Sequence, residues 1–372
     1  MKKTIKIGIV GVGNIGSVHL NTIITNQIEG GTLGGLCDID KEKLSALKEK
    51  HPQIPVFEKY EDLINSGIDA VIIATPHYLH PTIAEYAIER GVHVLTEKPF
   101  GVFTKGGKQL CQKAEDKGVV FGIMLNQRVN KLYTLAKKLI DKGEIGKIQR
   151  NVWIITNWYR TQQYYESDSW RGSYTGEGGG VLLNQAPHNL DLWQWLCGMP
   201  KTIYAVCKNG KYHNISVEDE ATIIAEYENG ATGTFITTTG DKYGTNRLEI
   251  SGECGSILLE KGKLILQRDG QKLRTFRDKE YNGHKEIIKD FVNAIVKGKE
   301  LIAPATEGLK SLEISNCAYL SSYKGEVVAL PIDENEFLSF LEEMQKKEHP
   351  VSKKDTEKPL NDTYKRKWNT NW

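Results

Sequence analysis

The stretch IKIGIVGVGNIG, residues 5–16, decides the fold of the N-terminal part of this chain. Its β-branched first half predicts a strand over residues 5–10, and the glycines that follow predict a tight turn into a helix over residues 19–28. Gly11 permits the turn, Gly13 lets the backbone approach a ligand, and Gly16 lets helix and strand pack closely. The helix N-terminus then offers free N–H groups and a positive dipole, which suit a pyrophosphate.

The same alternation of short apolar runs and amphipathic stretches continues to about residue 125. Further strands are predicted over residues 32–37, 70–75, 93–96 and 119–124, with helices over residues 41–50 and 81–90 between them. Strands separated by crossover helices form a parallel sheet. We therefore expect an α/β protein whose N-terminal domain, residues 1–126, is a doubly wound Rossmann domain.

The pattern of apolar residues changes after Met124. A helix over residues 131–142 precedes longer strand-like runs that are separated by turn sequences such as Glu228-Asn229-Gly230, which favour antiparallel hairpins. Residues 127–344 are thus predicted to form a C-terminal α/β domain with a large, mostly antiparallel open sheet, for substrate binding and oligomerisation. Residues 345–372 form a basic C-terminal tail with eight Lys or Arg, four Asp or Glu and a net charge of +4.

Asp38 closes the second predicted strand, where a carboxylate can accept hydrogen bonds from the adenosine ribose of a dinucleotide. A 2′-phosphate would be repelled there, which predicts NAD rather than NADP as the cofactor. Lys41 and Lys43 lie close enough along the chain to keep NADP open. A phosphate loop of the Walker type is excluded because no Lys-Ser or Lys-Thr pair follows the glycines.

Composition excludes several classes of protein. A net charge of +2 over 372 residues is not that of a strongly basic nucleic-acid binder. No stretch approaches the roughly 18 apolar residues of a membrane span, and polar residues interrupt any signal peptide, so we expect a cytoplasmic protein. The six cysteines form no CxxC pair and lie scattered in apolar segments, which favours free thiols and predicts no metal site.

Two clusters carry candidate catalytic side chains. Lys98, in Glu97-Lys98-Pro99, follows a strand at the carboxyl edge of the sheet, where it can stabilise developing alkoxide charge. The second cluster, residues 178–191, places Asn184, His188 and Asp191 on one face if it forms a single helix. Histidine is the most frequent general base. A surface lysine and a buried structural histidine are the alternatives.

Together these motifs resemble those of the Gfo/Idh/MocA family of nicotinamide-dependent sugar and cyclitol oxidoreductases. The resemblance rests on the glycine motif, Ala74-Thr75-Pro76 with His80, Glu97-Lys98-Pro99 and the 178–191 block. It implies that Lys98 and His188 form the catalytic pair, that the peptide before Pro99 is cis, and that the protein is a homo-oligomer, a dimer or tetramer. The predicted cofactor contacts are Gly11, Gly13, Asn14, Ile15, Gly16, Asp38, Thr75, Pro76, His80, Glu97, Lys98 and Gln127.

Asn184 departs from the family, which commonly has Asp at this position. An amide can orient His188 or a sugar hydroxyl, but it cannot contribute the charge that raises the pKa of an imidazole. Two hypotheses remain open: His188 works with orientation alone, or Asp191 contributes the charge. Asn184 is retained as a catalytic candidate beside Lys98 and His188.

The substrate prediction comes from residues 153–174, which hold seven aromatic residues. Ring faces stack on the C–H face of a pyranose and arginines donate to its oxygens, although a packed loop or a subunit contact would have the same composition. The predicted substrate contacts are Trp158, Arg160, Trp170, Arg171, Asn184 and His188. The pattern also resembles a subgroup that oxidises glycosides at the C3 hydroxyl to 3-keto sugars.

We therefore expect an NAD-dependent oxidoreductase acting on a secondary hydroxyl of a pyranose sugar or glycoside. Oxidation of an inositol-type cyclitol is the near alternative. A redox-neutral enzyme with tightly bound NAD, which eliminates or cleaves a glycoside, is a second one. A non-enzymatic sensor of sugar or NAD is the third, and the presence of both Lys98 and His188 argues against it.

Overall fold

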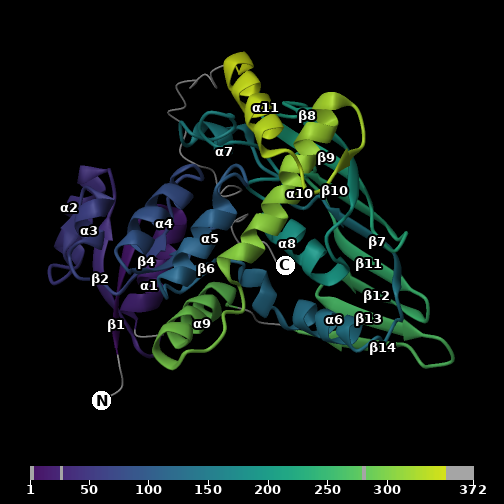
Figure 1. The fold of residues 1–372 in the computed structure, drawn as a ribbon, viewed down its shortest axis with the longest axis horizontal. Coiled ribbons are helices and arrows are strands. Elements are labelled where there is room, and N and C mark those ends of the chain that lie inside the picture. Colours follow the sequence, from purple (N-terminus) through teal and green to yellow (C-terminus); the bar gives the residue numbers. More distant parts are fainter. Residues whose placement is uncertain (1–3, 26–27, 279–281, 349–372) are drawn as a thin grey trace. The chain divides into compact units, whose positions relative to one another are not determined.

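The computed structural model describes residues 4–25, 28–278 and 282–348, and the chain divides into two compact units (Figure 1). The first unit contains the described residues of Met1–Val129 and Tyr281–Leu309, and the second those of Asn130–Glu280 and Lys310–Trp372. The basic tail from residue 349 onward lies outside the described residues. Among the described helices, none is both long and apolar enough to cross a membrane.

The first unit is built on a six-stranded parallel sheet with the strand order β3-β2-β1-β4-β5-β6. This confirms the predicted doubly wound Rossmann fold. The strands are β1 (Ile5–Val10), β2 (Gly31–Cys37), β3 (Val56–Phe57), β4 (Ala70–Ile73), β5 (His93–Thr96) and β6 (Phe121–Ile123). The order reverses between β1 and β4, and ligands of such folds bind at the carboxyl ends of strands at this point.

The helices of the first unit follow the predicted alternation. They are α1 (Asn14–Ile24), α2 (Lys41–Lys50), α3 (Tyr60–Ile64), α4 (Leu79–Glu89), α5 (Gly107–Asp116), the short 3₁₀ helix η1 (Asn126–Val129) and α9 (Gly283–Lys297). The helix predicted over residues 19–28 begins earlier, at Asn14, and ends at Ile24. It begins earlier because Gly13 is the N-cap, so that the last residues of the glycine motif already lie in the helix.

The return of residues 282–309 to the first unit differs from the predicted 127–344 domain. The buried face of α9 includes Ile287, Ile288 and Phe291, and α9 contacts α1, β5 and η1. An isolated β-bridge from Gly122 to Pro304 extends the same association. The amphipathic period of α9 indicates which of its faces is buried, but it does not indicate which part of the chain covers that face.

The second unit is built on a nine-stranded sheet with the order β14-β13-β12-β11-β7-β10-β9-β8-β15. All neighbouring strands are antiparallel except β7 and β10, which confirms the predicted mostly antiparallel sheet. The strands are β7 (Ile148–Ile155), β8 (Thr202–Asn209), β9 (Glu218–Glu226), β10 (Thr232–Thr238), β11 (Asn246–Gly252), β12 (Gly255–Glu260), β13 (Lys263–Arg268), β14 (Arg274–Arg277) and β15 (Val328–Ala329).

Buried and more exposed side chains alternate along these strands, so the sheet has one buried and one partly exposed face. Trp153 and Phe235 point to the buried face and pack with Trp193 of α8, whose ring centroid lies 5.4 Å from that of Phe235. The exposed apolar side chains Tyr204 and Ile224 lie on the other face. The helices of this unit are α6 (Lys131–Asp141), α7 (Gln162–Glu166), α8 (Pro187–Cys197), most of α10 (Ala305–Lys324), and α11 (Glu334–Lys347).

Candidate active site

The glycine motif of the first unit leaves a helix N-terminus open. Gly11 has a φ of +87°, and a Cβ there would lie 2.5 Å from the backbone oxygen of Ala74. A Cβ on Gly16 would lie 1.9 Å from the backbone oxygen of Gly11, so both positions require glycine. Around a Cβ on Gly13 the space is open to 4 Å, and α1 has no side-chain cap. The N–H groups at the start of α1, which include those of Asn14 and Ile15, can therefore serve an anion.

Asp38 ties this loop to the end of β2. Its Oδ2 accepts a hydrogen bond of 2.8 Å from the Val12 N–H and one of 3.3 Å from Lys43 Nζ, and its Oδ1 accepts one of 3.1 Å from the Asp40 N–H. Each carboxylate oxygen has two main acceptor directions, so a further donor can be accommodated. Lys43 therefore lies beside the carboxylate that the sequence analysis assigned to the ribose.

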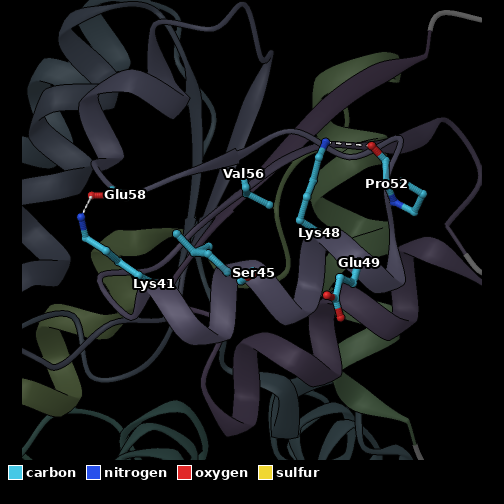
Figure 2. A pocket seen from close by; sticks show the side chains of 8 residues that line it. Lys41, Ser45, Lys48, Glu49, Pro52, Val56 and Glu58 are labelled. Atoms are coloured by element: carbon cyan, nitrogen blue, oxygen red, sulfur yellow. Dashed lines mark hydrogen bonds and ion pairs between the residues drawn. The ribbon is translucent and has the colours of Figure 1, made fainter.

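A shallow hollow on α2 and β3 lies outside the predicted site. Its polar groups pair with one another: Lys41 Nζ lies 2.9 Å from Glu58 Oε2, and Lys48 Nζ donates to the Pro52 oxygen at 2.7 Å (Figure 2). Lys41 therefore pairs with Glu58, whereas Lys43 pairs with Asp38. None of the residues that line the hollow is a predicted site residue.

Several buried polar atoms lie after the ends of β4 and β6. Thr75 Oγ1, Asn126 Oδ1 and both amide atoms of Gln127 have no hydrogen-bond partner among the described residues. Asn126 and Gln127 are almost completely buried. Buried polar groups normally have partners, because leaving one without a hydrogen bond costs about 1–3 kcal/mol. A bound polar ligand would give these atoms partners.

His80 links the segments on either side of this edge. One ring nitrogen lies 2.8 Å from the Pro99 oxygen and the other lies 2.7 Å from the Thr75 oxygen. Burial lowers the pKa of His80, and the hydrogen bonds to both backbone oxygens oppose that effect. The peptide before Pro99 is cis, as predicted. His80 thus holds the backbone around Pro76 and Lys98 in place.

Glu97 is the anionic centre of a buried network beside Lys98. Its Oε1 lies 2.8 Å from His19 Nε2, and its Oε2 accepts a hydrogen bond from the Lys98 N–H at 3.2 Å. Burial opposes ionisation, but the hydrogen bond from His19 and the charges of His19, His284 and Lys98 outweigh it and lower the pKa of Glu97 to about 2. The carboxylate therefore fixes the Lys98 backbone.

His284 reaches this network from the returning helix α9. Its Nε2 lies 3.0 Å from Asn126 Nδ2, and its ring lies 5.7 Å from that of His19. Burial lowers the pKa of His284. The sequence analysis did not select His19, Asn126 or His284, although His19 follows the glycine motif on the next turn of α1 and could have been found from that spacing.

In the second unit, the structure corrects the prediction of one helix bearing Asn184, His188 and Asp191. Helix α8 begins at Pro187, so only His188 and Asp191 lie on it. Asn184 lies in the preceding turns, where its N–H donates to the Gly180 oxygen at 2.9 Å. The reason is Pro187, which has no N–H to continue a helix from the residues before it and instead favours the first helical position.

Asn184 belongs to a buried polar cluster that the sequence did not reveal. Its Nδ2 donates to Glu177 Oε1 and, at 3.2 Å, to the Tyr164 hydroxyl. Arg171 Nη1 and Gln185 Nε2 donate to the same hydroxyl at 2.5 and 3.3 Å. Glu177 is only 1% exposed. Neither Glu177 nor Tyr164 was a predicted site residue, because only the folded loop brings them to Asn184.

The predicted substrate residues around this cluster are mostly packed. Arg171 lies with its guanidinium carbon 4.4 Å from the ring centroids of both Tyr164 and Trp170, and its Nε donates to Asp168 Oδ2 at 2.9 Å. Arg160 lies over the Trp158 and Tyr164 rings, 5.9 and 5.1 Å from their centroids. Trp153, by contrast, belongs to the sheet core.

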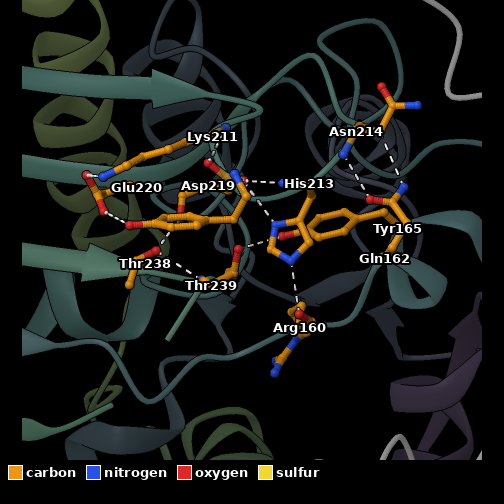
Figure 3. A network of polar contacts seen from close by, with 12 residues as sticks. Arg160, Gln162, Tyr165, Lys211, His213, Asn214, Asp219, Glu220, Thr238 and Thr239 are labelled. Atoms are coloured by element: carbon orange, nitrogen blue, oxygen red, sulfur yellow. Dashed lines mark hydrogen bonds and ion pairs between the residues drawn. The ribbon is translucent and has the colours of Figure 1, made fainter. Parts of the chain in front are cut away.

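A second network fixes the backbone at Arg160. His213 Nδ1 lies 3.0 Å from Asp219 Oδ2, and His213 Nε2 lies 3.0 Å from the Arg160 oxygen (Figure 3). Asp219 is fully buried and also accepts the N–H groups of Lys211, Tyr212 and His213 itself. His213 therefore holds the Arg160 segment against a rigid carboxylate.

Glu218 fixes the start of the glycine-rich segment that leads to Asn184. It is completely buried and accepts hydrogen bonds from the Gly180 N–H, the Leu182 N–H and the Tyr319 hydroxyl, at 2.8, 2.9 and 2.8 Å. A Cβ on Gly180 would lie 1.9 Å from the Glu218 backbone oxygen. The segment before α8 can pass here only because Gly180 has no side chain.

Comparison with known proteins identifies the family. Residues 5–125 match the model described as the oxidoreductase family, NAD-binding Rossmann fold, and residues 133–258 match the GFO/IDH/MocA C-terminal domain. The chain belongs to the Gfo/Idh/MocA family of oxidoreductases. Membership confirms the predicted family and the predicted cofactor NAD, because the N-terminal domain of this family binds it.

Relatives of known activity act on cyclitols and sugars. The chain is 25% identical to a scyllo-inositol 2-dehydrogenase (NAD(+)) of Bacillus subtilis (strain 168) over 89% of this chain and 98% of that protein. It is 29% identical to a levoglucosan dehydrogenase of Pseudarthrobacter phenanthrenivorans over 51% of this chain and 55% of that protein. A structure of the WlbA dehydrogenase from Bordetella pertussis, in complex with NADH and UDP-GlcNAcA, superimposes with a TM-score of 0.78. It is 28% identical over 89% of this chain and 100% of that chain.

The first unit fits the cofactor of this family. The uncapped N-terminus of α1 and the open space at Gly13 suit the pyrophosphate, and the Asp38 carboxylate suits a ribose. The Thr75 hydroxyl and the Gln127 amide are buried polar groups that a bound dinucleotide can satisfy. Lys98 belongs to this unit, whereas His188, Asn184 and the predicted substrate residues belong to the second.

Proposed function

We propose that this protein is an NAD-dependent dehydrogenase that oxidises a secondary hydroxyl of a pyranose sugar or glycoside. The observation that carries the proposal is Lys98, which follows β5 at the carboxyl edge of an NAD-binding sheet, with its backbone fixed by Glu97 and by the His80 contact to Pro99. When bound, NAD supplies the hydride acceptor at nicotinamide C4. The Lys98 ammonium donates a hydrogen bond to the substrate hydroxyl and stabilises the alkoxide charge that develops on it.

His188 is proposed as the general base that takes the hydroxyl proton. It lies in the first turn of α8 and is 6% exposed, so it is held in a fixed orientation within the second unit. An imidazole titrates near neutral pH and can accept a proton in one step and return it in the reverse reaction. His188 holds the proton as an imidazolium and then releases it to solvent, so that the oxidation needs no co-reactant besides NAD.

The polar cluster of the second unit supports a neutral, hydroxylated substrate. The Arg171 charge is paired with Asp168 and lies between aromatic rings, while the side chains of Asn184 and Gln185 are neutral amides. These three side chains form hydrogen bonds without adding an unpaired positive charge, which suits sugar hydroxyls more than a carboxylate or phosphate. The C3 hydroxyl of a glycoside is the position we propose. A cyclitol is the second candidate, because one relative is a scyllo-inositol 2-dehydrogenase.

A substrate panel tests this function. Purified protein with NAD is expected to produce NADH, followed at 340 nm, with methyl glucosides and more slowly with myo- and scyllo-inositol. A 3-deoxy glucoside should give no signal while the matched 2-deoxy glucoside does. Turnover of inositols alone would establish the cyclitol alternative, and glycoside cleavage without added NAD would establish a redox-neutral enzyme. Absence of NADH formation with every pyranose and cyclitol would contradict the proposal.

Replacing Asp38 should weaken the preference for NAD. We expect Asp38→Ser to raise the Kd for NADH about tenfold, because ribose hydrogen bonds are lost, and to lower the Kd for NADPH, because Lys43 is released from its carboxylate partner. Fluorescence titration of both cofactors measures the two constants. Lys41→Ala, which removes a lysine paired with Glu58 instead, is the matched control. Tighter binding of NADPH than NADH by the unmodified protein would show that the role given to Asp38 is wrong.

A further inference from the structure

Glu177 is a buried carboxylate whose two oxygens both have defined partners. Its Oε2 accepts a hydrogen bond of 2.7 Å from the Gly172 N–H, and its Oε1 accepts one from Asn184 Nδ2. The residue is 1% exposed, so water does not replace either contact. The carboxylate is therefore fixed by the backbone at one end and bonded to Asn184 at the other.

This contact determines which way the Asn184 amide faces. A carboxylate only accepts hydrogen bonds, so the amide nitrogen of Asn184 must point toward Glu177. The second hydrogen of that nitrogen is used by the Tyr164 hydroxyl at 3.2 Å, and Arg171 holds this hydroxyl in place at 2.5 Å. Both amide hydrogens are thus engaged, and Oδ1 is the atom through which Asn184 meets any other group.

We propose that Glu177 is a positioning residue of the active site, which turns Asn184 so that its acceptor oxygen faces any group outside the cluster, and which contributes the negative charge that Asn184 itself lacks. This inference rests on the proposed function. It offers a third answer to the departure of Asn184 from the Asp common in the family. An Asp would combine the negative charge and the acceptor oxygen in one side chain. Here Glu177 carries the charge and Asn184 carries the acceptor oxygen, and a hydrogen bond joins the two residues. Asp191, the other candidate for the charge, accepts a hydrogen bond from Gln194 on its own helix at 3.2 Å.

Exchanging the two side chains tests the pair. Glu177→Gln alone leaves two amides, which pair in either orientation, so Oδ1 of Asn184 is no longer the only outward atom. Asn184→Asp alone places two carboxylates at hydrogen-bond distance, which repel each other. The double variant Glu177→Gln, Asn184→Asp restores one amide donating to one carboxylate, with the same total charge and the acceptor at position 184.

We expect each single variant to lower kcat for the oxidised sugar about 10- to 100-fold, with a smaller change in KM. The double variant should return to within about fivefold of the unmodified protein, because the pair is restored. NADH binding depends on the first unit and should be unchanged in all three variants, and intrinsic tryptophan fluorescence is the control for folding of the second unit. If kcat of the double variant falls by the product of the two single-variant losses, the proposal is overturned.

The pH dependence of the Asn184→Asp variant gives a second test that does not require the double variant to fold. Two adjacent carboxylates share a proton as the pH falls, which returns the pair to a single negative charge. The other titratable or charged groups of this cluster are Arg160, Tyr164, Tyr165, Asp168 and Arg171. The activity of this variant relative to the unmodified protein should therefore be several-fold higher at pH 6 than at pH 8. A ratio that does not change with pH would count against Glu177. Failure of the proposed function would be distinct, because the unmodified protein would then oxidise no polyol.

Discussion

Lys98→Met is expected to lower kcat about 10²-fold or more with the oxidised sugar, and His188→Ala to have an effect of similar size. The methionine keeps the length and apolar stem of lysine but cannot donate to the developing alkoxide. Alanine at position 188 removes the general base. Stopped-flow or steady-state production of NADH measures both effects.

Both variants should leave the other predicted cofactor contacts in place. Glu97 is fixed by His19, and Asp38 by the Val12 N–H, so NADH should still bind within a few-fold of its normal Kd. Lys105→Met, at an exposed lysine of the same unit, is the matched control. Near-normal turnover of either variant would remove that residue from the mechanism. A rise in KM with kcat unchanged would reduce its role to binding.

Glu218→Ala is expected to destabilise the second unit by about 3–5 kcal/mol. The change leaves three buried donors, the N–H groups of Gly180 and Leu182 and the Tyr319 hydroxyl, without their acceptor. The tryptophans of the described residues, Trp153, Trp158, Trp170, Trp193 and Trp195, all lie in the second unit, so intrinsic fluorescence during urea unfolding reports on that unit. An unfolding free energy within 1 kcal/mol of normal would show that other groups satisfy these donors.

The same carboxyl should make stability depend on pH. Burial raises the pKa of Glu218 from 4.5 to about 7, against the opposing hydrogen bonds from Leu182, Tyr319 and Gly180. A raised pKa means that the folded state favours the protonated form, so this contribution is complete below pH 4.5 and is lost as the pH rises through about 7. Relative to Glu218→Gln, which does not titrate, the unmodified protein should lose on the order of 2 kcal/mol between pH 5 and pH 8. If the difference in unfolding free energy between the two proteins is the same at pH 5 and pH 8, the raised pKa of Glu218 is contradicted.

The features that the sequence predicted correctly depend on neighbouring residues. The strand over residues 5–10 and the glycine motif after it identified the Rossmann sheet, because β-branched runs and positive φ values act within a few residues. The turn sequences after residue 126 predicted an antiparallel sheet for the same reason. The shared face of Asn184, His188 and Asp191 depended on a single helix through residues 184–191, and this condition does not hold because the helix begins at Pro187.

The site residues that the sequence did not predict have partners that are distant in the sequence or that lie elsewhere in an irregular loop. Glu177 meets Asn184 through an irregular loop, and a carboxylate before three glycines carries no periodicity that would mark it as buried. Likewise, His284 fell within the predicted 127–344 domain, since only the packing of α9 on the first unit brings it beside His19. Asn126 became visible as a site residue only through its buried, unsatisfied oxygen.

The sequence by itself therefore determined the two kinds of sheet, the cofactor and the family, because these depend on local backbone preferences and on motifs of contiguous residues. Only the tertiary structure decided which partners stand beside the buried carboxylates of the proposed site: His19 beside Glu97, and Asn184 beside Glu177. The physical reason is that a hydrogen bond in a buried site depends on distances of about 3 Å between groups, which are set by packing and not by separation along the chain.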